Sequence, residues 1–158
     1  MNTEQPSLSE ENYRENVGMV LKNNHGLVLA GEVFRYKGEW MMPQGGIKQA
    51  ESPLQAMERE LLEETGISLS EIKLLDETDS WFYYLLRRPL TLDGKQYLGQ
   101  KQKWFLMEYQ GELPDAESTM DREFSYFAWV EPEWLVQQAA KYKIDIYKRV
   151  FDSFANHF

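Results

Sequence analysis

Hydrophobic residues in this 158-residue chain fall mainly in short runs, several of which alternate with polar residues. A period of two is typical of β-strands that bury one face. The pattern predicts six strands, over residues 17–21, 27–34, 72–78, 81–86, 102–109 and 124–130. Residues 23–26 and the pair Asp93-Gly94 supply turn residues, and Pro43 ends a short extended piece at 40–42.

Near the C-terminus the period changes to that of a helix. Ile146, Val150 and Phe154 recur every four residues, with Tyr147 and Phe151 beside them. This stripe predicts a helix packed on the core rather than a partner-binding surface.

A second helix is predicted over residues 53–65. Ser52 and Gln55 form a capping box, Pro53 suits the first helical position, and Gly66 suits the C-terminal end. We expect its apolar side to consist of Leu54, Met57, Leu61 and Leu62. Strands and helices therefore interleave in an α/β order, while periodicity alone leaves the strand order open.

Composition indicates one folded domain, since 42% of the residues are hydrophobic and 14% aromatic. The polar residues 1–12 are expected to be a flexible tail before a domain at 13–158, and they do not resemble a signal peptide. The apolar runs are too short to span a membrane. The chain has no cysteine, which suits a cytoplasmic protein. We interpret His25 as a turn residue and His157 as part of a frayed terminus.

The predicted 53–65 helix carries three carboxylates, Glu60, Glu63 and Glu64, at positions i, i+3 and i+4. They project from one face and repel one another, which is unfavourable unless a cation lies between them. Oxygen ligands favour a hard cation, so we expect Mg²⁺ or Mn²⁺. Glu58 points away from this face, whereas Arg59 lies at its edge and could pair with Glu51 or with a ligand. A solvated acidic helix face is the alternative interpretation.

The residues around these carboxylates match a longer signature. Nine positions agree: Gly45, Glu51, Arg59, Glu60, Leu61, Glu63, Glu64, Gly66 and Ile67. With these residues the chain resembles the Nudix hydrolases. The resemblance implies an α/β/α sandwich with a mixed β-sheet, and metal-dependent cleavage of a nucleoside diphosphate linked to another group.

Four further segments narrow the resemblance. They are YRENVG at 13–18, WMMPQGGI at 40–47, GQKQKWF at 99–105 and YKIDIYKRV at 142–150. They are similar to the branch that contains RNA pyrophosphohydrolases and diadenosine polyphosphate hydrolases. The segment 33–39, and Glu15 in place of a proline, depart from that branch at positions that concern substrate contacts.

The resemblance also implies roles for individual residues. Glu60, Glu63 and Glu64 are the expected metal ligands, with the backbone of Gly45 close to metal or phosphate. Glu123 is expected to be a remote catalytic acid that binds metal or accepts a proton from water, with Asp121 as its rival. The residues expected to face nucleotide or phosphate are Arg14, Gln100, Lys103, Tyr142 and Lys143.

The net charge of −9 opposes binding of a polyanion, although bound metal would neutralise the acidic site locally. Basic residues could still form a phosphate-binding rim; they are Arg87, Arg88, Lys101, Lys103, Lys141, Lys143, Lys148 and Arg149. We expect removal of pyrophosphate from triphosphorylated RNA 5′ ends, with hydrolysis of dinucleoside polyphosphates as the alternative. The alternative outside the enzymes is a catalytically silent module that binds a nucleotide or RNA. The sequence leaves the oligomeric state open.

Overall fold

A computed structural model describes residues 8–158 of the protein. The described strands form one eight-stranded sheet. They are β1 Tyr13–Lys22, β2 Val28–Val33, β3 Trp40–Met41, β4 Gln44–Gly46, β5 Ile72–Glu77, β6 Phe82–Leu92, β7 Lys95–Tyr109 and β8 Phe124–Val130. The α-helices are α1 Pro53–Thr65, α2 Pro132–Gln138 and α3 Ile144–Ser153. Short 3₁₀ helices cover Glu10–Asn12, Leu69–Glu71, Ala116–Ser118, Lys141–Lys143 and Ala155–His157.

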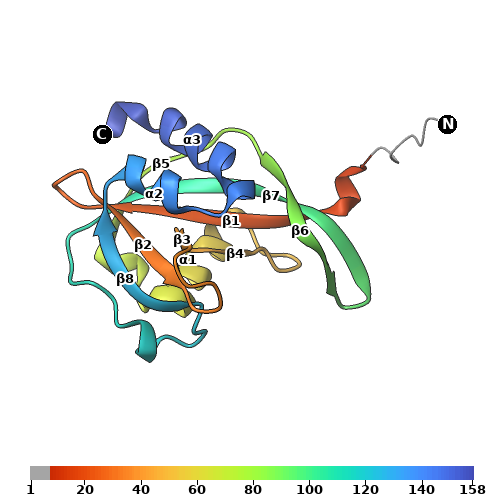
Figure 1. Ribbon diagram of the computed structural model, residues 1–158, viewed down its shortest axis with the longest axis horizontal. Helices are drawn as coiled ribbons and strands as arrows, with labels where there is room; N and C mark the ends of the chain where they lie inside the picture. Colours follow the sequence, from red (N-terminus) through yellow and green to blue (C-terminus); the bar gives the residue numbers. More distant parts are fainter. Residues whose placement is uncertain (1–7) are drawn as a thin grey trace.

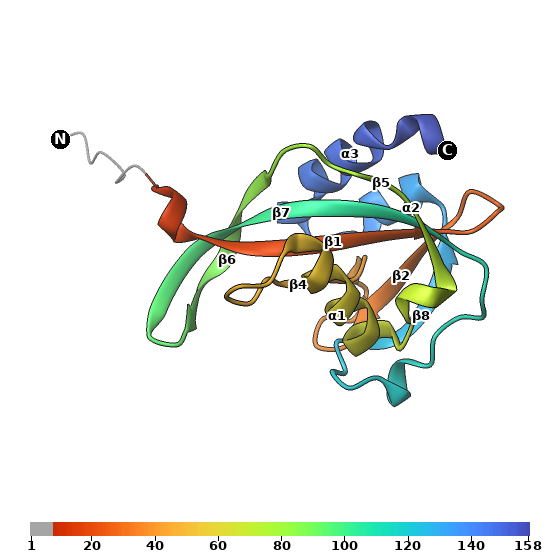
Figure 2. The ribbon, with the colours of Figure 1, turned by 180° about the vertical axis from the view of Figure 1, so that it is seen from behind.

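The sheet is mixed, and β1 and β7 form its parallel centre. Their pairing runs unbroken from Tyr13 opposite Gly99 to Lys22 opposite Glu108. The other pairs are antiparallel. Figures 1 and 2 show α1 on one side of the sheet and α3 on the other, which confirms the expected α/β/α sandwich.

Each face of the sheet has its own hydrophobic core. On the α1 side, Met57 and Leu61 pack with alternate residues of β1 and β7. On the α3 side, Trp104 of β7 and Tyr147 pack edge to face, with ring centroids 5.8 Å apart. Gly18 is required at this contact, because a Cβ there would lie 2.5 Å from the Trp104 ring.

The structure confirms the predicted helix at 53–65 and the predicted strand at 124–130, with the same bounds. The apolar side predicted for α1 was wrong in part, since Leu54 and Leu62 are exposed. Ala56 and Thr65 are buried instead, because the buried stripe turns toward Met57 and Leu61.

Other elements differ from the sequence prediction. Strands β6 and β7 extend well beyond the predicted runs, as a hairpin closed by Asp93 and Gly94, both with positive φ. Strand β4 and helix α2 were not predicted. His157 is not a frayed end, since its Nε2 lies 3.1 Å from Asp76 Oδ2.

Residues 1–7 of the expected tail lie outside the described part of the chain. Glu10–Asn12, also in that expected tail, form a 3₁₀ helix, and Glu10 contacts Tyr83 and Lys101. Within residues 8–158, none of the helices is both long and apolar enough to cross a membrane.

Candidate active site

The site is built on α1 and on the strand that precedes it. Ser52 Oγ accepts a hydrogen bond from Gln55 N, and Gln55 Oε1 accepts one from Ser52 N, so the predicted capping box is confirmed. Gly66 ends the helix in the left-handed region, with φ of 77°. The two ends fix the register of α1 and therefore the face from which its carboxylates project.

Arg59 organises the acidic face. Its Nε and Nη2 each donate to Glu51 at 2.8 Å, and its Nη1 donates to Glu60 at 2.8 Å and to Glu63 at 3.1 Å. Nη2 also donates to the carbonyl of Gly46 at 2.8 Å. The bond from Arg59 lowers the pKa of Glu51 to about 2. One guanidinium thus ties the helix to the strand–loop segment before it.

Glu64 is the most deeply buried of the three carboxylates. Its Oε2 accepts a hydrogen bond from the backbone N–H of Gln44 at 3.1 Å. Burial raises its pKa well above the ordinary value, and the charges of Glu60 and Glu123 raise it further. Burial also raises the pKa of Glu60, against the influence of Arg59. Ionised carboxylates in this position require a nearby cation.

Gly45 gives the acidic face close access to the backbone. A Cβ at this position would lie 1.9 Å from the Glu60 carboxyl carbon, so a side chain would displace that carboxylate. This cradle and the raised pKa values fit a divalent cation held by oxygen atoms. Within the described residues, no three acidic or histidine side chains are yet gathered closely enough to hold a metal. Glu60 and Glu63 are instead turned toward Arg59.

The loop before β8 brings Glu123 toward the helix. The N–H of Asp121 contacts the Glu63 carbonyl at 3.5 Å, and the Glu123 carbonyl accepts a bond from Phe34 N at 2.9 Å. Glu123 lies close enough to Glu64 for its charge to affect the pKa of that residue. Its side chain is exposed, and its place in the loop before β8 brings a second element close to α1.

On the α3 side of the sheet, Lys143 reaches the same strand. It is only 5% exposed, and its Nζ donates to Gln44 Oε1 at 3.0 Å. Burial lowers its pKa to about 8, although the charge of Glu64 opposes this shift. Gln44 thus joins the two halves of the site, since its backbone binds Glu64 and its side chain binds Lys143.

A buried series of hydrogen bonds through Gln102 holds the Gln44 side chain in place. Gln102 Nε2 donates to Gln44 Oε1 at 3.2 Å and to Asn16 Oδ1 at 2.7 Å, while Gln102 Oε1 accepts from Trp104 Nε1. These glutamines and Asn16 were not predicted as site residues. The PQGG segment signalled the position of Gln44, but only the pairing of β4 with β1 shows its contacts.

The other predicted substrate residues divide into two groups. Arg14 packs over Gly46, where a Cβ would lie 2.0 Å from its Nη2. Gln100 is buried and accepts a bond from Tyr84 Oη at 3.1 Å. Tyr142 is half-buried beside Tyr84, with ring centroids 5.9 Å apart. Gln100 and Tyr142 thus both contact Tyr84 on the α3 side of the sheet, the side that Lys143 approaches.

Lys103 is the exception among the predicted substrate residues. It alternates with Gln102 along β7, so the two side chains leave opposite faces of the strand. Its Nζ donates to the Asp79 carbonyl at 3.2 Å and lies 5.5 Å from the Trp81 ring centroid. Its contacts are therefore with the segment before β6 and not with the Gln44 cluster.

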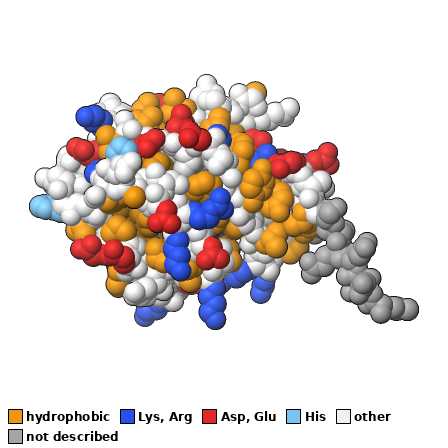
Figure 3. Space-filling view, turned by 90° about the horizontal axis from the view of Figure 1, so that it is seen from above, with side chains coloured by type: hydrophobic (Ala, Val, Ile, Leu, Met, Phe, Trp, Pro, Cys, Tyr) orange, Lys and Arg blue, Asp and Glu red, His pale blue; other side chains and the backbone are white. Residues whose placement is uncertain are grey.

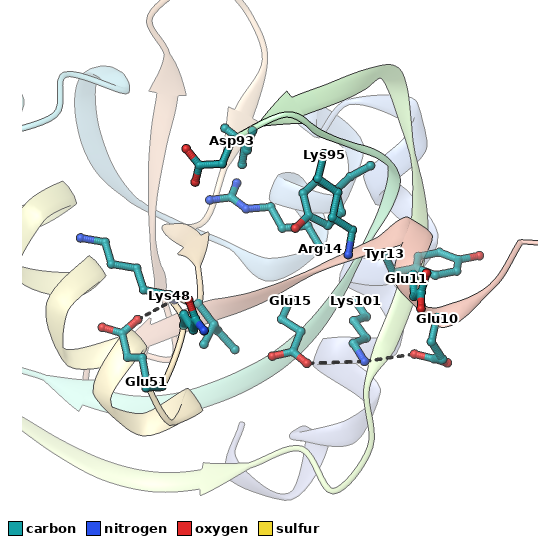
Figure 4. A pocket seen from close by; sticks show the side chains of 15 residues that line it. Glu10, Glu11, Tyr13, Arg14, Glu15, Lys48, Glu51, Asp93, Lys95 and Lys101 are labelled. Atoms are coloured by element: carbon teal, nitrogen blue, oxygen red, sulfur yellow. Dashed lines mark hydrogen bonds and ion pairs between the residues drawn. The ribbon is translucent and has the colours of Figure 1, made fainter.

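A cavity of about 950 Å³ lies beside this site, between the 3₁₀ helix Glu10–Asn12, the loop before α1 and the β6–β7 hairpin. Figure 4 shows Lys101 between Glu10 and Glu15, to which its Nζ lies 3.0 and 3.7 Å away. Arg14 and Glu51 also line this cavity. Acidic and basic groups alternate around it, so it offers no uniformly positive surface to a polyphosphate.

Comparisons with known proteins identify the family. Residues 12–152 match the NUDIX domain. The chain is 40% identical over 153 residues to an RNA pyrophosphohydrolase of Proteus mirabilis, covering 94% of this chain and 86% of the relative. It is 39% identical to the RNA pyrophosphohydrolase of Salmonella arizonae, with the same coverage.

Solved structures of low identity share the fold. The Ap4A hydrolase of C. elegans in a binary complex superposes with a TM-score of 0.63 at 20% identity, covering 92% of this chain and 99% of that one. The dihydroneopterin triphosphate pyrophosphohydrolase of E. coli superposes with a TM-score of 0.66 at 14% identity, covering 87% of this chain and 95% of that one. Because the match covers residues 12–152 of 158, the chain belongs to the NUDIX domain family.

Proposed function

We propose that the protein is a metal-dependent pyrophosphohydrolase that removes pyrophosphate from the 5′ end of triphosphorylated RNA. The observation that carries this proposal is the double contact of Gln44, which places a buried carboxylate and a buried ammonium at one strand. The relatives that are about 40% identical over most of the chain are RNA pyrophosphohydrolases, which supports RNA as the substrate.

Each half of the site has a separate task. Glu60, Glu63 and Glu64, with the Gly45 backbone, would hold Mg²⁺ or Mn²⁺. When bound, such an ion neutralises phosphate oxygens and acidifies water. Lys143 and Arg14 hold phosphate oxygens through charge-assisted hydrogen bonds.

Glu123 completes the chemistry from the β8 side. Because its carboxylate faces Glu64 from a different loop, it can bind the metal or take the proton from attacking water. The mutual repulsion of these carboxylates has no use in a silent binding module, which is why we favour catalysis.

Dinucleoside polyphosphates are the second candidate substrate. The Arg87 guanidinium lies 4.8 Å from the ring centroid of Tyr36 and 4.9 Å from that of Tyr142, so planar groups are in contact beside Lys143. A nucleobase of either substrate could stack on the exposed part of these groups.

A competition experiment separates the two candidates. Purified protein with Mg²⁺ is given 5′-triphosphorylated RNA and diadenosine tetraphosphate together, and the products are resolved. We expect pyrophosphate and 5′-monophosphorylated RNA to form first, with a higher kcat/KM for RNA. Preferential formation of ATP and AMP would support the dinucleotide instead.

A further inference from the structure

Tyr142 forms a wall shared by two pockets on the α3 side. The inner pocket, of about 90 Å³, contains Lys143 and Arg87. The outer pocket, of about 600 Å³, lies next to it and is lined by Tyr83, Tyr84, Tyr142, Asp145, Ile146, Lys148 and Arg149. A chain whose end is held by Lys143 can therefore continue past the Tyr142 ring into the outer pocket.

Aromatic rings and a guanidinium group lie along this path. The rings of Tyr84 and Tyr142 are inclined at 36° to one another at the boundary between the pockets. Farther along, the exposed Arg149 guanidinium covers the buried ring of Phe82, 4.4 Å from its centroid, so the planar group accessible there is the guanidinium. Single-stranded nucleic acid is bound by such surfaces, on which bases stack, combined with cations that contact the backbone.

The charge of the outer pocket differs from that of the whole molecule. Lys148 and Arg149 are exposed, and neither forms an ion pair with another residue in 8–158. Asp145 is the acidic residue among the pocket's lining residues. Figure 3, seen from above, shows Lys and Arg side chains next to hydrophobic ones on this face, with acidic side chains among them. Around the outer pocket itself the lining holds two cations, Lys148 and Arg149, and one acidic residue, in a chain with net charge −9. The outer pocket is thus a locally basic, aromatic surface.

We propose that this outer pocket binds the RNA nucleotides that follow the 5′-terminal ones, with Lys148 and Arg149 contacting their phosphates. The inference rests on the proposed function and extends it to the body of the substrate. A dinucleoside polyphosphate has no phosphate beyond its second nucleoside, so contacts here favour RNA.

The test compares triphosphorylated RNAs of two and eight nucleotides with the same 5′ dinucleotide, and diadenosine tetraphosphate. For the unmodified protein we expect kcat/KM to be higher for the eight-nucleotide RNA. Lys148→Glu should lower kcat/KM for that RNA roughly three- to tenfold, while the dinucleotide and diadenosine tetraphosphate change little. Arg149→Gln should act in the same direction. Each lost phosphate contact should also reduce the salt dependence of log KM by about 0.7.

Lys73→Glu is the matched control, because Lys73 is an exposed lysine of β5 and the charge change is identical. Equal hydrolysis of both RNAs by the unmodified protein would overturn the outer site alone. An equal loss on every substrate, or an equal loss in Lys73→Glu, would also overturn it. If only diadenosine tetraphosphate is cleaved, the proposed function fails and the RNA site fails with it.

Discussion

At the scale of single residues, Glu64 shows how function opposes stability. It is buried beside other carboxylates, and its raised pKa means that ionisation is unfavourable in the folded, metal-free protein. A folded pKa above the unfolded value means that stability is lost as pH rises from about 4.5 through the raised pKa. Metal binding to the ionised Glu64 carboxylate would restore this stability.

Glu64→Gln should therefore separate the two properties. The amide can still accept the bond from Gln44 N, so unfolding of the metal-free protein at pH 7 should require on the order of 1 kcal/mol more, or ~2–4 °C in Tm. Activity should fall at least ~100-fold, because a metal ligand is lost. Calorimetry and turnover measure the two effects. Glu58→Gln is the control, since Glu58 is exposed on the helix; equal damage there would mean that the assigned face is wrong.

The lowered pKa of Lys143 predicts that kcat/KM depends on pH. Its pKa of about 8 means that the free enzyme loses the ammonium as pH rises through 8, so kcat/KM should decline on that alkaline limb. Lys143→Arg stays charged throughout, and the limb should vanish even if overall activity is lower. A decline that persists unchanged in Lys143→Arg would assign the limb to another group.

Glu123 and Lys143 should affect different kinetic constants. Glu123→Gln should lower kcat about 10²- to 10⁴-fold with little change in KM, because the carboxylate acts on metal or water. Lys143→Ala should mainly raise KM, since it removes a phosphate contact. Steady-state kinetics on triphosphorylated RNA gives both constants. An unchanged kcat for Glu123→Gln would return Asp121 to consideration.

The helical spacing of Glu60, Glu63 and Glu64 was readable from the sequence, because i, i+3 and i+4 positions share a face. The role of Gln44 was not, since its contacts come from elements about 60 and 100 residues away in the chain. The surroundings of Lys103 were not readable either, because they depend on the register of β7 in the sheet, and its role in substrate binding stays a prediction.

At the scale of elements, the helices and strands that could be predicted are those with signals in their own local sequence. Helix α1 has caps at both ends, so its bounds could be predicted. Strand β4 has three residues, two of them glycine, and exists because it pairs with residues 16–18 of β1. Arg87, Arg88 and Pro89 interrupt the hydrophobic pattern of β6, and the hairpin beyond them is largely exposed, so alternation did not reveal its length.

The glycines of β4 make an element-level prediction. Gly45→Ala places a methyl group against the Glu60 carboxylate, so the strand and helix must separate or the side chain must turn away. We expect activity to fall at least ~100-fold while the protein remains folded, because the change moves a metal ligand and not the core. Circular dichroism and turnover test this. Full activity in Gly45→Ala would show that the close approach is not needed.

At the scale of the whole molecule, groups from the two faces of the sheet meet at Gln44. Carboxylates come from the α1 side of the sheet and the ammonium of Lys143 from the α3 side, and both reach Gln44. The net charge of −9 described this arrangement poorly, because the carboxylates lie on α1 while Lys143, Lys148 and Arg149 lie at the start of α3 or on it. Strand order and cross-sheet contacts, which hydrophobic periodicity leaves open, decide the site.

The most direct test measures pyrophosphate released from 5′-triphosphorylated RNA by the purified protein, with Mg²⁺ or Mn²⁺ and again after chelation by EDTA. The account predicts one pyrophosphate per RNA end with metal, loss of release after chelation, and recovery when metal is restored. Undiminished release after exhaustive chelation, or no release with either metal, would contradict it.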